Sequence, residues 1–555
     1  MRILLLVHAF NSLAQRLFVE LAERGHDLTI EFDVNDAVTR EAVAAVRPDL
    51  VLAPFLKRAI PEDVWRRVPC LIVHPGPPGD RGPSSLDWAV LEGAERWGVT
   101  VLQADGEFDA GPVWASQTFP MRDAAKAGLY RREVTEAAVT AVMQALERLT
   151  GGGAPMPVDP AAVRSRPVLP WSSRAIDWAA DDTATVLRKI RSADGVPGVR
   201  DRVAGLHVNL FDAHPESRLT GPPGALLAQH HGAVCRATVD GAVWIGHMKR
   251  RSADPAAPTL KLPAAMVLGD AAVGLPEVDG DHRDVWYEES AGVGYLHFPF
   301  YNGAMGAGQC ARLLAALGTA LRRAPRVLVL MGGPDFWSNG IHLNLIEAAD
   351  SPADESWRTI NAINDVARAV LTAGDTLTVS ALAGNAGAGG VFLALAADRV
   401  WARRGAVLNP HYRGMGNLYG SEYWTYVLPR RVGAEHARAV TEARLPMGAP
   451  EAVRRGLVDE AFGTTVEDFR AGVRARAEAL AADPVLPELL AEKRRRRAAD
   501  EAEKPLERYR EEELERMHLN FYGFDPSYHV ARYNFVFKIP KSRTPLYLAR
   551  HRRAD

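Results

Sequence analysis

The segment IVHPGPPGDRGPSSLDWAVLEG, residues 72–93, contains the end of a strand, a loop and a helix in succession. The apolar run 70–74 is typical of a buried strand, the glycines and prolines that follow are typical of a loop, and helical spacing begins after Ser84. We place the helix over 84–92, with Ser84 as its cap and Asp87 at its third position. Strand, loop and helix in this order favour a parallel sheet covered by helices.

The same alternation extends through the first 150 residues. A helix is expected at about 12–24, and Gly25 can end it in a left-handed conformation. Further strands are expected at 3–7, 28–32, 50–53 and 99–103. Because open parallel sheets bind ligands beyond the carboxyl ends of their strands, the loop after His74 is a candidate functional loop.

The remaining chain divides into a linker, a β-rich part and a second α/β part. Residues 151–170 are rich in Gly and Pro, which is typical of a linker. Short β-like runs then follow one helix and favour a small β-barrel, and strand–helix alternation returns from about residue 281. We therefore expect an α/β protein with a Rossmann-like domain (1–165), an OB-like β-barrel (166–272) and a second α/β domain with a helical tail (273–555).

Composition and charge exclude several classes. Lys and Arg number 66 against 68 Asp and Glu, so the formal charge is -2 and no basic field indicates binding to nucleic acid or to an acidic membrane. The charged tail from about residue 484 interleaves both signs, which favours a solvated helix face. The whole chain contains three cysteines, Cys70, Cys235 and Cys310. They are too far apart in the sequence to indicate a disulfide framework or a cysteine zinc site. The apolar start, 3–7, is too short for a signal peptide, and we expect a cytoplasmic protein without a membrane span.

His74 and Asp109 form the first candidate site. Each follows an expected strand. A carboxylate bonded to one imidazole nitrogen fixes the tautomer and raises the basicity of the ring, which leaves the other nitrogen for proton transfer. From the residues alone, a capping Asp and an unrelated surface His explain the pattern more simply.

Residues 72–93 resemble the N-x-H-P…R-G…W-A-I-x-x-G run of 10-formyltetrahydrofolate-dependent formyltransferases. The motifs G-V-T-V (98–101) and D-A-G-P-V (109–113) are similar to that family's G-V-T and D-T-G-P, and R-A-I-D-W (174–178) resembles the start of its small C-terminal barrel. The resemblance covers about residues 1–270. It implies catalytic roles for His74 and Asp109 and folate-binding roles for Phe55, Arg81 and Gln103.

One residue departs from this family. Its catalytic Asn is replaced by Ile72, two residues before His74. A side chain that helps to stabilise the developing oxyanion is therefore missing, which argues against ordinary formylation of an amine.

The second candidate site combines two segments of the second α/β part. GNAGAGG (384–390) opens an apolar helix, and FWSNGIHL (336–343) follows a strand. Glycines at a helix start expose backbone N–H groups to an anion or oxyanion, although a tight turn with close helix packing explains them equally well. The sequence contains neither G-K-[ST] nor G-x-G-x-x-G, which excludes the corresponding nucleotide-binding loops.

Together these segments resemble the F-x-A-G-A-D-L and G-x-A-x-G-G-G-x-E-L motifs of the crotonase (enoyl-CoA hydratase/isomerase) superfamily, over about residues 285–465. The resemblance implies an oxyanion hole for a CoA thioester, built from the backbone N–H groups of Asn339 and Gly389 with Gly340 beside them. Phe392 and Tyr412 stand where the hydratase has catalytic glutamates, so hydration of a double bond is not expected. A polar pair, Tyr412 and Glu422, remains as the expected catalytic pair.

As a whole the chain resembles the HypX family of [NiFe]-hydrogenase maturation factors, with N-P-H-Y at 409–412 and Y-H-x-A-R-x-N-F-V-x-K at 528–538. The resemblance implies synthesis of a carbon monoxide ligand: formyl passes from 10-formyltetrahydrofolate to coenzyme A, and formyl-CoA then splits into CO and CoA. It implies small-molecule substrates, no metal and no nucleic acid. A hydrogenase maturation complex or the hydrogenase large subunit is the implied protein partner.

Two other functions stay open at this point. One is a formyltransferase that acts on an amine, with the second α/β domain reduced to a lid. The other is a non-catalytic scaffold that delivers an iron-ligand precursor, which the lost Asn and the two lost glutamates favour. Against the scaffold, His74, Asp109 and both glycine segments are retained.

Overall fold

The computed structural model describes residues 1–252, 254 and 257–553 of the chain. These residues form two compact units. Unit 1 consists of Met1–Arg283 and a C-terminal segment that begins at Lys541, and unit 2 consists of Asp284–Pro540. The chain therefore leaves unit 1, builds unit 2 and returns, whereas the sequence places everything after residue 273 in one domain.

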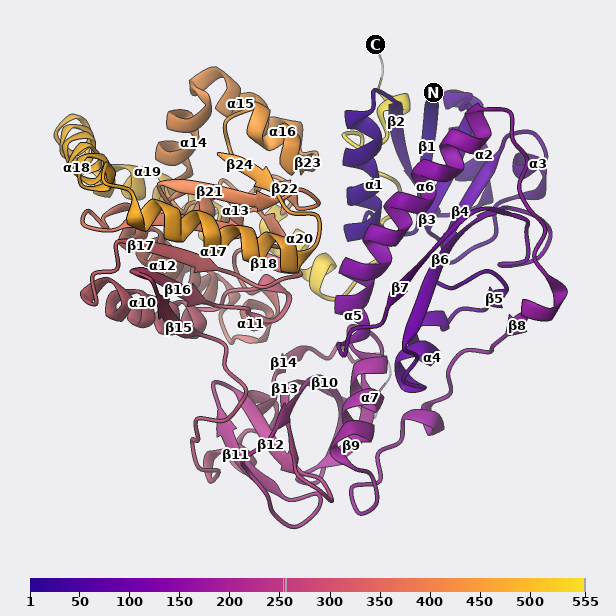
Figure 1. Cartoon of the computed structure of the whole chain (residues 1–555), viewed down its shortest axis with the longest axis horizontal. Coiled ribbons are helices and arrows are strands. Elements are labelled where there is room, and N and C mark those ends of the chain that lie inside the picture. Colours follow the sequence, from indigo (N-terminus) through magenta and orange to yellow (C-terminus); the bar gives the residue numbers. More distant parts are fainter. Residues whose placement is uncertain (253, 255–256, 554–555) are drawn as a thin grey trace. The chain divides into compact units, whose positions relative to one another are not determined.

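The N-terminal part of unit 1 is an α/β sheet with the strand order β2-β1-β3-β4-β6-β7 (Figure 1). The first four strands are parallel, and β6 runs antiparallel to β4 and to β7. The strands are β1 (Arg2–Val7), β2 (Asp27–Phe32), β3 (Leu50–Phe55), β4 (Cys70–His74), β6 (Arg96–Gln103) and β7 (Val113–Pro120). The expected α/β fold is confirmed, and His74 is the last residue of β4.

Helices cover both faces of this sheet. α1 (Ser12–Glu23) and α6 (Thr135–Thr150) pack against each other and against the strands. α2 (Asp36–Val46) and α3 (Glu62–Trp65) pack on the opposite face, where Ala42 and Val64 meet the alternate strand residues Leu4 and Leu6. Gly25 follows α1 with a φ of 80°, as the sequence predicts.

The start of α4 (Ser85–Leu91) differs from the expectation. Ser84 makes no capping bond to the helix, because its hydroxyl accepts a hydrogen bond from the Leu169 backbone N–H instead (3.1 Å). Asp87 in the first turn pairs with Lys126 (2.9 Å) and Arg174. The polar groups at this helix start therefore hold the linker and the next domain in place.

The β-rich part of unit 1 is an antiparallel sheet with the order β11-β12-β13-β10-β9, and β14 pairs with β13. Its strands are β9 (Val199–Val203), β10 (Leu206–Glu216), β11 (Leu226–His230), β12 (Ala233–Ala237), β13 (Ala242–Arg250) and β14 (Lys261–Pro263). The helix α7 (Thr183–Ala193), capped by Asp182, buries Val186, Leu187 and Ile190 against the sheet.

Residues 541–553, here called the C-terminal strap, complete unit 1 by packing on its edge strand β2. The Ile30 N–H donates to the Leu548 carbonyl (3.2 Å), and the Phe32 N–H donates to the Thr544 hydroxyl (2.6 Å). Glu31, which is buried, bonds Thr544 and lies 3.1 Å from Nε2 of His551. The strap thus covers a sheet edge and neutralises a buried carboxylate.

Unit 2 contains a sheet with the order β15-β16-β17-β19-β21-β24 (Figure 1). Its strands are β15 (Trp286–Ser290), β16 (Val293–His297), β17 (Val327–Met331), β19 (Leu377–Leu382), β21 (Arg399–Arg403) and β24 (Glu460–Phe462). α10 (Ala307–Arg322) and α12 (Pro352–Leu371) pack on one face, and α17 (Val466–Ala482) packs on the other.

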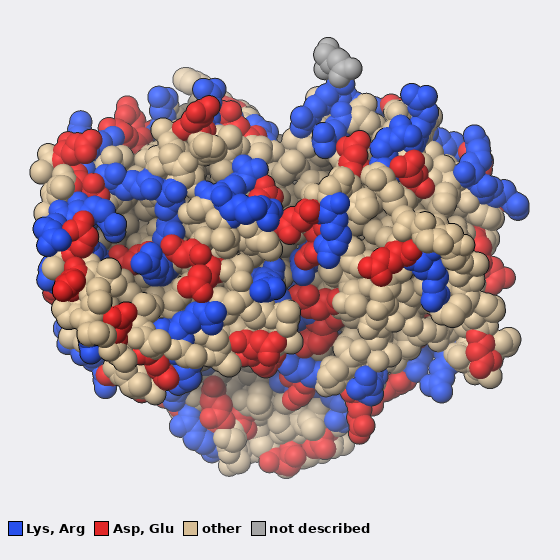
Figure 2. Space-filling model, turned by 45° about the horizontal axis from the view of Figure 1, so that its top comes forward, with Lys and Arg blue, Asp and Glu red and all other residues tan. Residues whose placement is uncertain are grey.

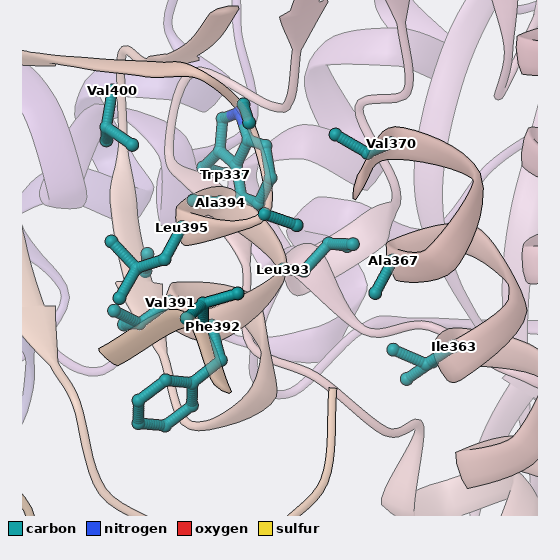
Figure 3. Close-up of a cluster of buried hydrophobic side chains, with 14 of the residues drawn as sticks. Trp337, Ile363, Ala367, Val370, Val391, Phe392, Leu393, Ala394, Leu395 and Val400 are labelled. Atoms are coloured by element: carbon teal, nitrogen blue, oxygen red, sulfur yellow. The ribbon is translucent and has the colours of Figure 1, made fainter. Parts of the chain in front are cut away.

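A second, smaller sheet joins the two glycine-containing segments of unit 2. Its order is β18-β20-β22-β23, from β18 (Phe336–Ser338), β20 (Asn385–Gly387), β22 (Val407–Asn409) and β23 (Met447–Gly448). The short helix α13 (Gly389–Leu395) follows β20 and is buried along its whole length. Figure 3 shows Ile363, Ala367 and Val370 of α12 on the side that faces α13. This packing fixes Gly389 at the start of α13.

The charged tail forms the helices α18 (Leu486–Glu503), α19 (Leu506–Tyr522) and α20 (Ser527–Val536). Figure 2 shows acidic and basic side chains interleaved on the face in view. The expectation of a solvated helix face is wrong for three residues, one of which is Arg532, buried in an ion pair with Glu347 (2.7 Å). Lys493 is buried and forms an ion pair with Asp398 (2.6 Å), and Glu513 is completely buried. Among the described residues, no helix has the length and apolar character that crossing a membrane requires.

Candidate functional site

His74 lies at the carboxyl end of β4, beside Thr100 of β6, and is buried. Its Nδ1 lies 3.3 Å from Oδ1 of Asp109, so the structure brings the two predicted residues together. Asp109 has a φ of 54°, and its Oδ2 accepts a hydrogen bond from the Gly82 N–H (3.2 Å). Ile72, at the position of the formyltransferase Asn, packs against the apolar core of the sheet.

Sequence reasoning missed a second carboxylate on the same ring. Nε2 of His74 lies 2.9 Å from Oδ2 of Asp80, which is also buried. The nitrogen expected to stay open for proton transfer is therefore occupied. The five residues that separate the two are three prolines and two glycines, and no periodicity reveals how such a loop folds back.

The two carboxylates determine the electrostatics of the site. Burial lowers the pKa of His74, but the contacts with Asp109 and Asp80 raise it by more, to about 9. Burial raises the pKa of Asp109, but His74, the Gly82 N–H and Arg81 lower it by more, so it lies below its ordinary value. The contacts with the two carboxyl groups therefore favour the protonated form of the His74 ring.

The predicted folate-binding residues lie in different places. Phe55 ends β3, next to β4, and its ring contacts His8 edge-on at 5.9 Å between centroids. Arg81 lies close enough to Asp109 to act on its pKa. Gln103 pairs with Leu71, at the other end of β4 from His74, and its Oε1 accepts a hydrogen bond from Nε1 of Trp114 (3.0 Å). The structure therefore places Phe55 and Arg81 near His74 and separates Gln103 from it.

In unit 2 the two glycine segments meet as expected. β18 and β20 are parallel neighbours, and a methyl group on Gly340 would lie 3.3 Å from the Gly389 nitrogen. One detail differs: the Asn339 N–H already donates to the Gly303 carbonyl (2.7 Å) and cannot also serve an oxyanion. The Gly340 N–H donates to the side-chain hydroxyl of Ser338 (3.1 Å) and not to a backbone carbonyl. Gly340 and Gly389 are thus the better-placed pair of donors.

Tyr412 and Glu422 are in direct contact beside these glycines. Oη of Tyr412 lies 2.5 Å from Oε2 of Glu422 and 2.8 Å from the Ser421 carbonyl oxygen. Oε1 of Glu422 would lie only 2.2 Å from a methyl group on Gly389. The absence of a side chain at Gly389 therefore allows the carboxylate to approach the start of α13.

The contacts of Tyr412 suit either protonation state of Glu422. When Glu422 is ionised, the Tyr412 hydroxyl donates to it; when Glu422 is protonated, Glu422 donates to the Tyr412 oxygen, which in turn donates to Ser421. Burial raises the pKa of Glu422 to about 7, against the bond from Tyr412, which lowers it. Burial and Glu422 hold the pKa of Tyr412 well above its ordinary value. A carboxyl group that titrates near neutral pH is suited to accept and return a proton.

Phe392, at the other glutamate position of the crotonase motif, forms an apolar wall of this site. It is fully buried, and its ring stacks on that of Tyr412 with 5.0 Å between centroids and 18° between planes. The two positions that carry water-activating carboxylates in a hydratase therefore carry a phenyl ring and a phenol here. This arrangement fits the expectation that hydration is not the reaction.

Two further residues hold the Glu422 loop, and sequence reasoning missed both. Oδ1 of Asn364, on α12, accepts hydrogen bonds from the Glu422 N–H (2.8 Å) and the Ser421 hydroxyl (3.0 Å). Glu513, on α19, accepts hydrogen bonds from the Tyr423 N–H (3.0 Å) and the Thr425 N–H (2.9 Å). Burial raises the pKa of Glu513 to about 8, against the bonds from Thr425, which lower it.

Some buried polar atoms at both sites have no partner within the described structure. They are Nε of Arg81 in the first site and Nδ1 of His411 and Nε1 of Trp424 near the second. Buried polar atoms are normally satisfied, so each of these atoms can take a hydrogen bond from or to water or a polar ligand. Among the described residues, no cluster of three His, Cys, Asp or Glu side chains has the arrangement of a metal site.

Three family models match successive parts of the chain. The formyl transferase model matches residues 14–146, the formyl transferase C-terminal domain model matches 172–259, and the enoyl-CoA hydratase/isomerase model matches 289–521. A methionyl-tRNA formyltransferase from Roseiflexus castenholzii is 29% identical over 205 residues, which are 36% of this chain and 65% of the relative. This similarity covers about a third of the chain.

Two relatives match the chain over its whole length. The hydrogenase maturation factor HoxX from Bradyrhizobium diazoefficiens is 59% identical over 557 residues, which cover 100% of this chain and 97% of that protein. The crystal structure of HypX from Aquifex aeolicus in complex with tetrahydrofolic acid is 50% identical, with a TM-score of 0.97, and the match covers 100% of this chain and 99% of that one.

Proposed function

Since this chain belongs to the HypX/HoxX family of hydrogenase maturation factors, in which formyltransferase domains precede an enoyl-CoA hydratase/isomerase domain, we propose that it makes carbon monoxide for a hydrogenase. Unit 1 transfers a formyl group from 10-formyltetrahydrofolate to the thiol of coenzyme A. Unit 2 then splits formyl-CoA into CO and CoA. The tetrahydrofolic acid bound by the Aquifex aeolicus relative supports folate as the formyl donor.

His74 is the proton-transfer group of the first step. The bond between the formyl carbon and the folate nitrogen breaks as the bond to sulfur forms, and the thiol proton ends on the nitrogen. His74, held by Asp109 at 3.3 Å, carries protons between these two atoms. Ile72 supplies no amide to an oxyanion, in agreement with a thiol rather than an amine as the acceptor. Phe55 and Arg81 are the folate-binding residues nearest to this site; Gln103 binds folate only if the ligand reaches the far end of β4.

Glu422 and Tyr412 perform the second step. Glu422 removes the formyl proton, and the electron pair of that C–H bond stays on carbon as the lone pair of CO. The carbon–sulfur pair leaves with the sulfur while a lone pair of the formyl oxygen completes the C≡O bond. Tyr412, in contact with Glu422 at 2.5 Å, passes the proton to the thiolate. The Gly340 and Gly389 N–H groups hold the thioester oxygen. The proton moves from carbon to sulfur, so the step needs no reactant other than formyl-CoA.

The observation that carries this proposal is the buried Tyr412–Glu422 contact over Gly389. In this contact a carboxyl group whose burial raises its pKa to about 7 lies at the start of α13, in a site without the two hydratase glutamates, which supports its role as the base. A base and an acid without an activated water are what the cleavage of formyl-CoA requires, because water would hydrolyse the thioester to formate.

The direct test mixes the protein with 10-formyltetrahydrofolate and coenzyme A and follows deoxyhaemoglobin for its CO-bound spectrum. We expect CO to form in proportion to the folate consumed. A stable formamide product without CO would instead identify an amine formyltransferase, and no turnover of folate with any acceptor would identify a scaffold. Omission of coenzyme A is the matched control and should abolish CO formation.

The acceptor of the CO follows from family membership. We propose that the protein works in the cytoplasm with a hydrogenase maturation complex or with the hydrogenase large subunit. Co-purification of this chain with the large subunit from cells that make hydrogenase tests the proposal, and the absence of any complex in cells that release CO freely would contradict it.

A further inference from the structure

Asp80 is a carboxylate of the first site that lies outside the histidine and aspartate motifs. Its Oδ2 is 2.9 Å from Nε2 of His74, and Oδ1 of Asp109 is 3.3 Å from Nδ1 of the same ring. Gly76 makes this approach possible, because a methyl group there would lie 2.3 Å from Oδ2 of Asp80 and 2.5 Å from Nε2 of His74. The loop thus holds a carboxylate on each side of the imidazole.

This geometry favours one protonation state of His74 when both carboxyl groups are ionised. An ionised carboxylate only accepts hydrogen bonds, and a neutral imidazole carries an N–H on one nitrogen only. A neutral ring would therefore direct a lone pair at the oxygen of either Asp80 or Asp109. The imidazolium has a donor on each nitrogen and satisfies both contacts. The rise in the pKa of His74 to about 9 agrees with this assignment.

We propose that Asp80 is a positioning residue of the formyl-transfer site that, together with Asp109, holds His74 as a doubly protonated imidazolium. The inference rests on the proposed function and refines it: His74 begins the reaction as an acid. As the formyl carbon–nitrogen bond breaks, the folate nitrogen replaces Asp80 as the partner of Nε2 and takes its proton, and the thiol proton restores the imidazolium once sulfur has joined the formyl carbon. Asp80 itself acts only through the ring.

Titration of His74 in the full chain tests this directly. Histidine is labelled with 15N, and the His74 resonances are those lost in His74→Gln. We expect both ring nitrogens to be protonated at pH 7.5. In Asp80→Asn, which keeps the side-chain volume, the midpoint should fall by at least about one pH unit, because an opposite charge in contact is lost. Asp105→Asn removes an exposed carboxylate four residues before Asp109 and is the matched control, with an unchanged midpoint.

Kinetics provide the second measurement. The rate of folate-dependent formyl transfer should fall at high pH as His74 loses its proton, and in Asp80→Asn this fall should move to lower pH by the same amount as the titration midpoint. A neutral His74 in the parent at pH 7.5, or an identical midpoint in Asp80→Asn, would overturn the proposal. Titration of His74 in the parent protein tests the proposal even if Asp80→Asn does not fold. Because titration requires no turnover, failure of formyl transfer itself counts against the proposed function only.

Discussion

At the scale of single residues, the Tyr412–Glu422 contact offers the sharpest separation of the two proposed steps. Tyr412→Phe removes the hydroxyl that lies 2.5 Å from Glu422, and Glu422→Gln removes the base. Both variants should keep formyl transfer from folate to CoA in unit 1 and stop the release of CO. Formyl-CoA, or formate from its hydrolysis, should accumulate, as chromatography of the quenched reaction can show. Release of CO at the parent rate by both variants would assign the cleavage to other residues.

Gly389 allows a second test in the same site. The added methyl group of Gly389→Ala would lie 2.2 Å from Oε1 of Glu422 and must displace this carboxylate. A misplacement of about 1 Å can cost about 10²-fold in rate, so we expect CO release from added formyl-CoA to fall by at least about that factor. Gly318→Ala, in the middle of α10, meets only the end of the Arg322 side chain and should release CO normally. Equal rates in the two variants would contradict the assignment.

The sequence predicts part of this site and misses the rest for identifiable reasons. His74, Asp109, Tyr412 and Glu422 follow strand ends or motifs, and the structure brings each pair together. Asp80 is missed because a proline- and glycine-rich loop has no period that reveals where its side chains meet. The choice between the Asn339 and Gly340 N–H groups depends on the Gly303 carbonyl, a backbone contact that residue identities do not encode.

At the scale of elements, α19 supports the loop that carries Glu422. Glu422 and Tyr423 have φ values of 61° and 58°, a conformation that non-glycine residues adopt only when their surroundings enforce it. Glu513 of α19 does so by accepting the N–H groups of Tyr423 and Thr425 on its two oxygens. From the sequence, the interleaved charges of this segment predict a solvated helix face. The burial of one glutamate among several exposed ones depends on tertiary packing, which the charge pattern does not reveal.

This role of α19 predicts a selective defect. In Glu513→Gln an amide NH₂ must face one of the two backbone N–H groups, so the loop shifts and CO release should fall about 10²-fold. Formyl transfer in unit 1 should not change, and the KM for formyl-CoA should change less than kcat. Glu512→Gln is the matched control: its exposed carboxylate pairs with Lys504, and surface pairs contribute at most about 1 kcal/mol. A parent-like rate in Glu513→Gln would make Glu513 a packing residue only.

At the scale of the whole molecule, the two proposed steps require opposite protonation states of their titrating groups, Glu422 and His74. Glu422, with its pKa raised to about 7, must be ionised, so cleavage of formyl-CoA should speed up as the pH rises through about 7. His74, with its pKa raised to about 9, must be protonated, so formyl transfer should slow as the pH rises through about 9. CO synthesis from folate should therefore show a bell-shaped pH profile, with each limb found in one partial reaction. A single limb shared by both partial reactions would contradict this division.

Removal of the C-terminal strap should weaken unit 1, although the strap lies beyond unit 2 in the sequence. A chain that ends at Pro540 loses the contacts of Thr544 and His551 with Glu31 and the backbone hydrogen bonds that the strap accepts from β2, and each such bond contributes about 1 kcal/mol. Unfolding of the shortened chain in urea, monitored by the loss of formyl transfer, should show this decrease in the stability of unit 1. An unchanged midpoint on truncation would show that the strap contributes little.

The strap also sets an order of events during synthesis. The ribosome must complete all of unit 2 before residues 541–551 exist, which takes on the order of tens of seconds at cellular elongation rates. Throughout that interval the edge strand β2 of unit 1 lacks the strap that covers it. An uncovered edge strand is a template for pairing with other chains. The nascent protein is therefore most exposed to aggregation late in translation, when most of its chain has already folded, and it depends most on chaperones at that stage.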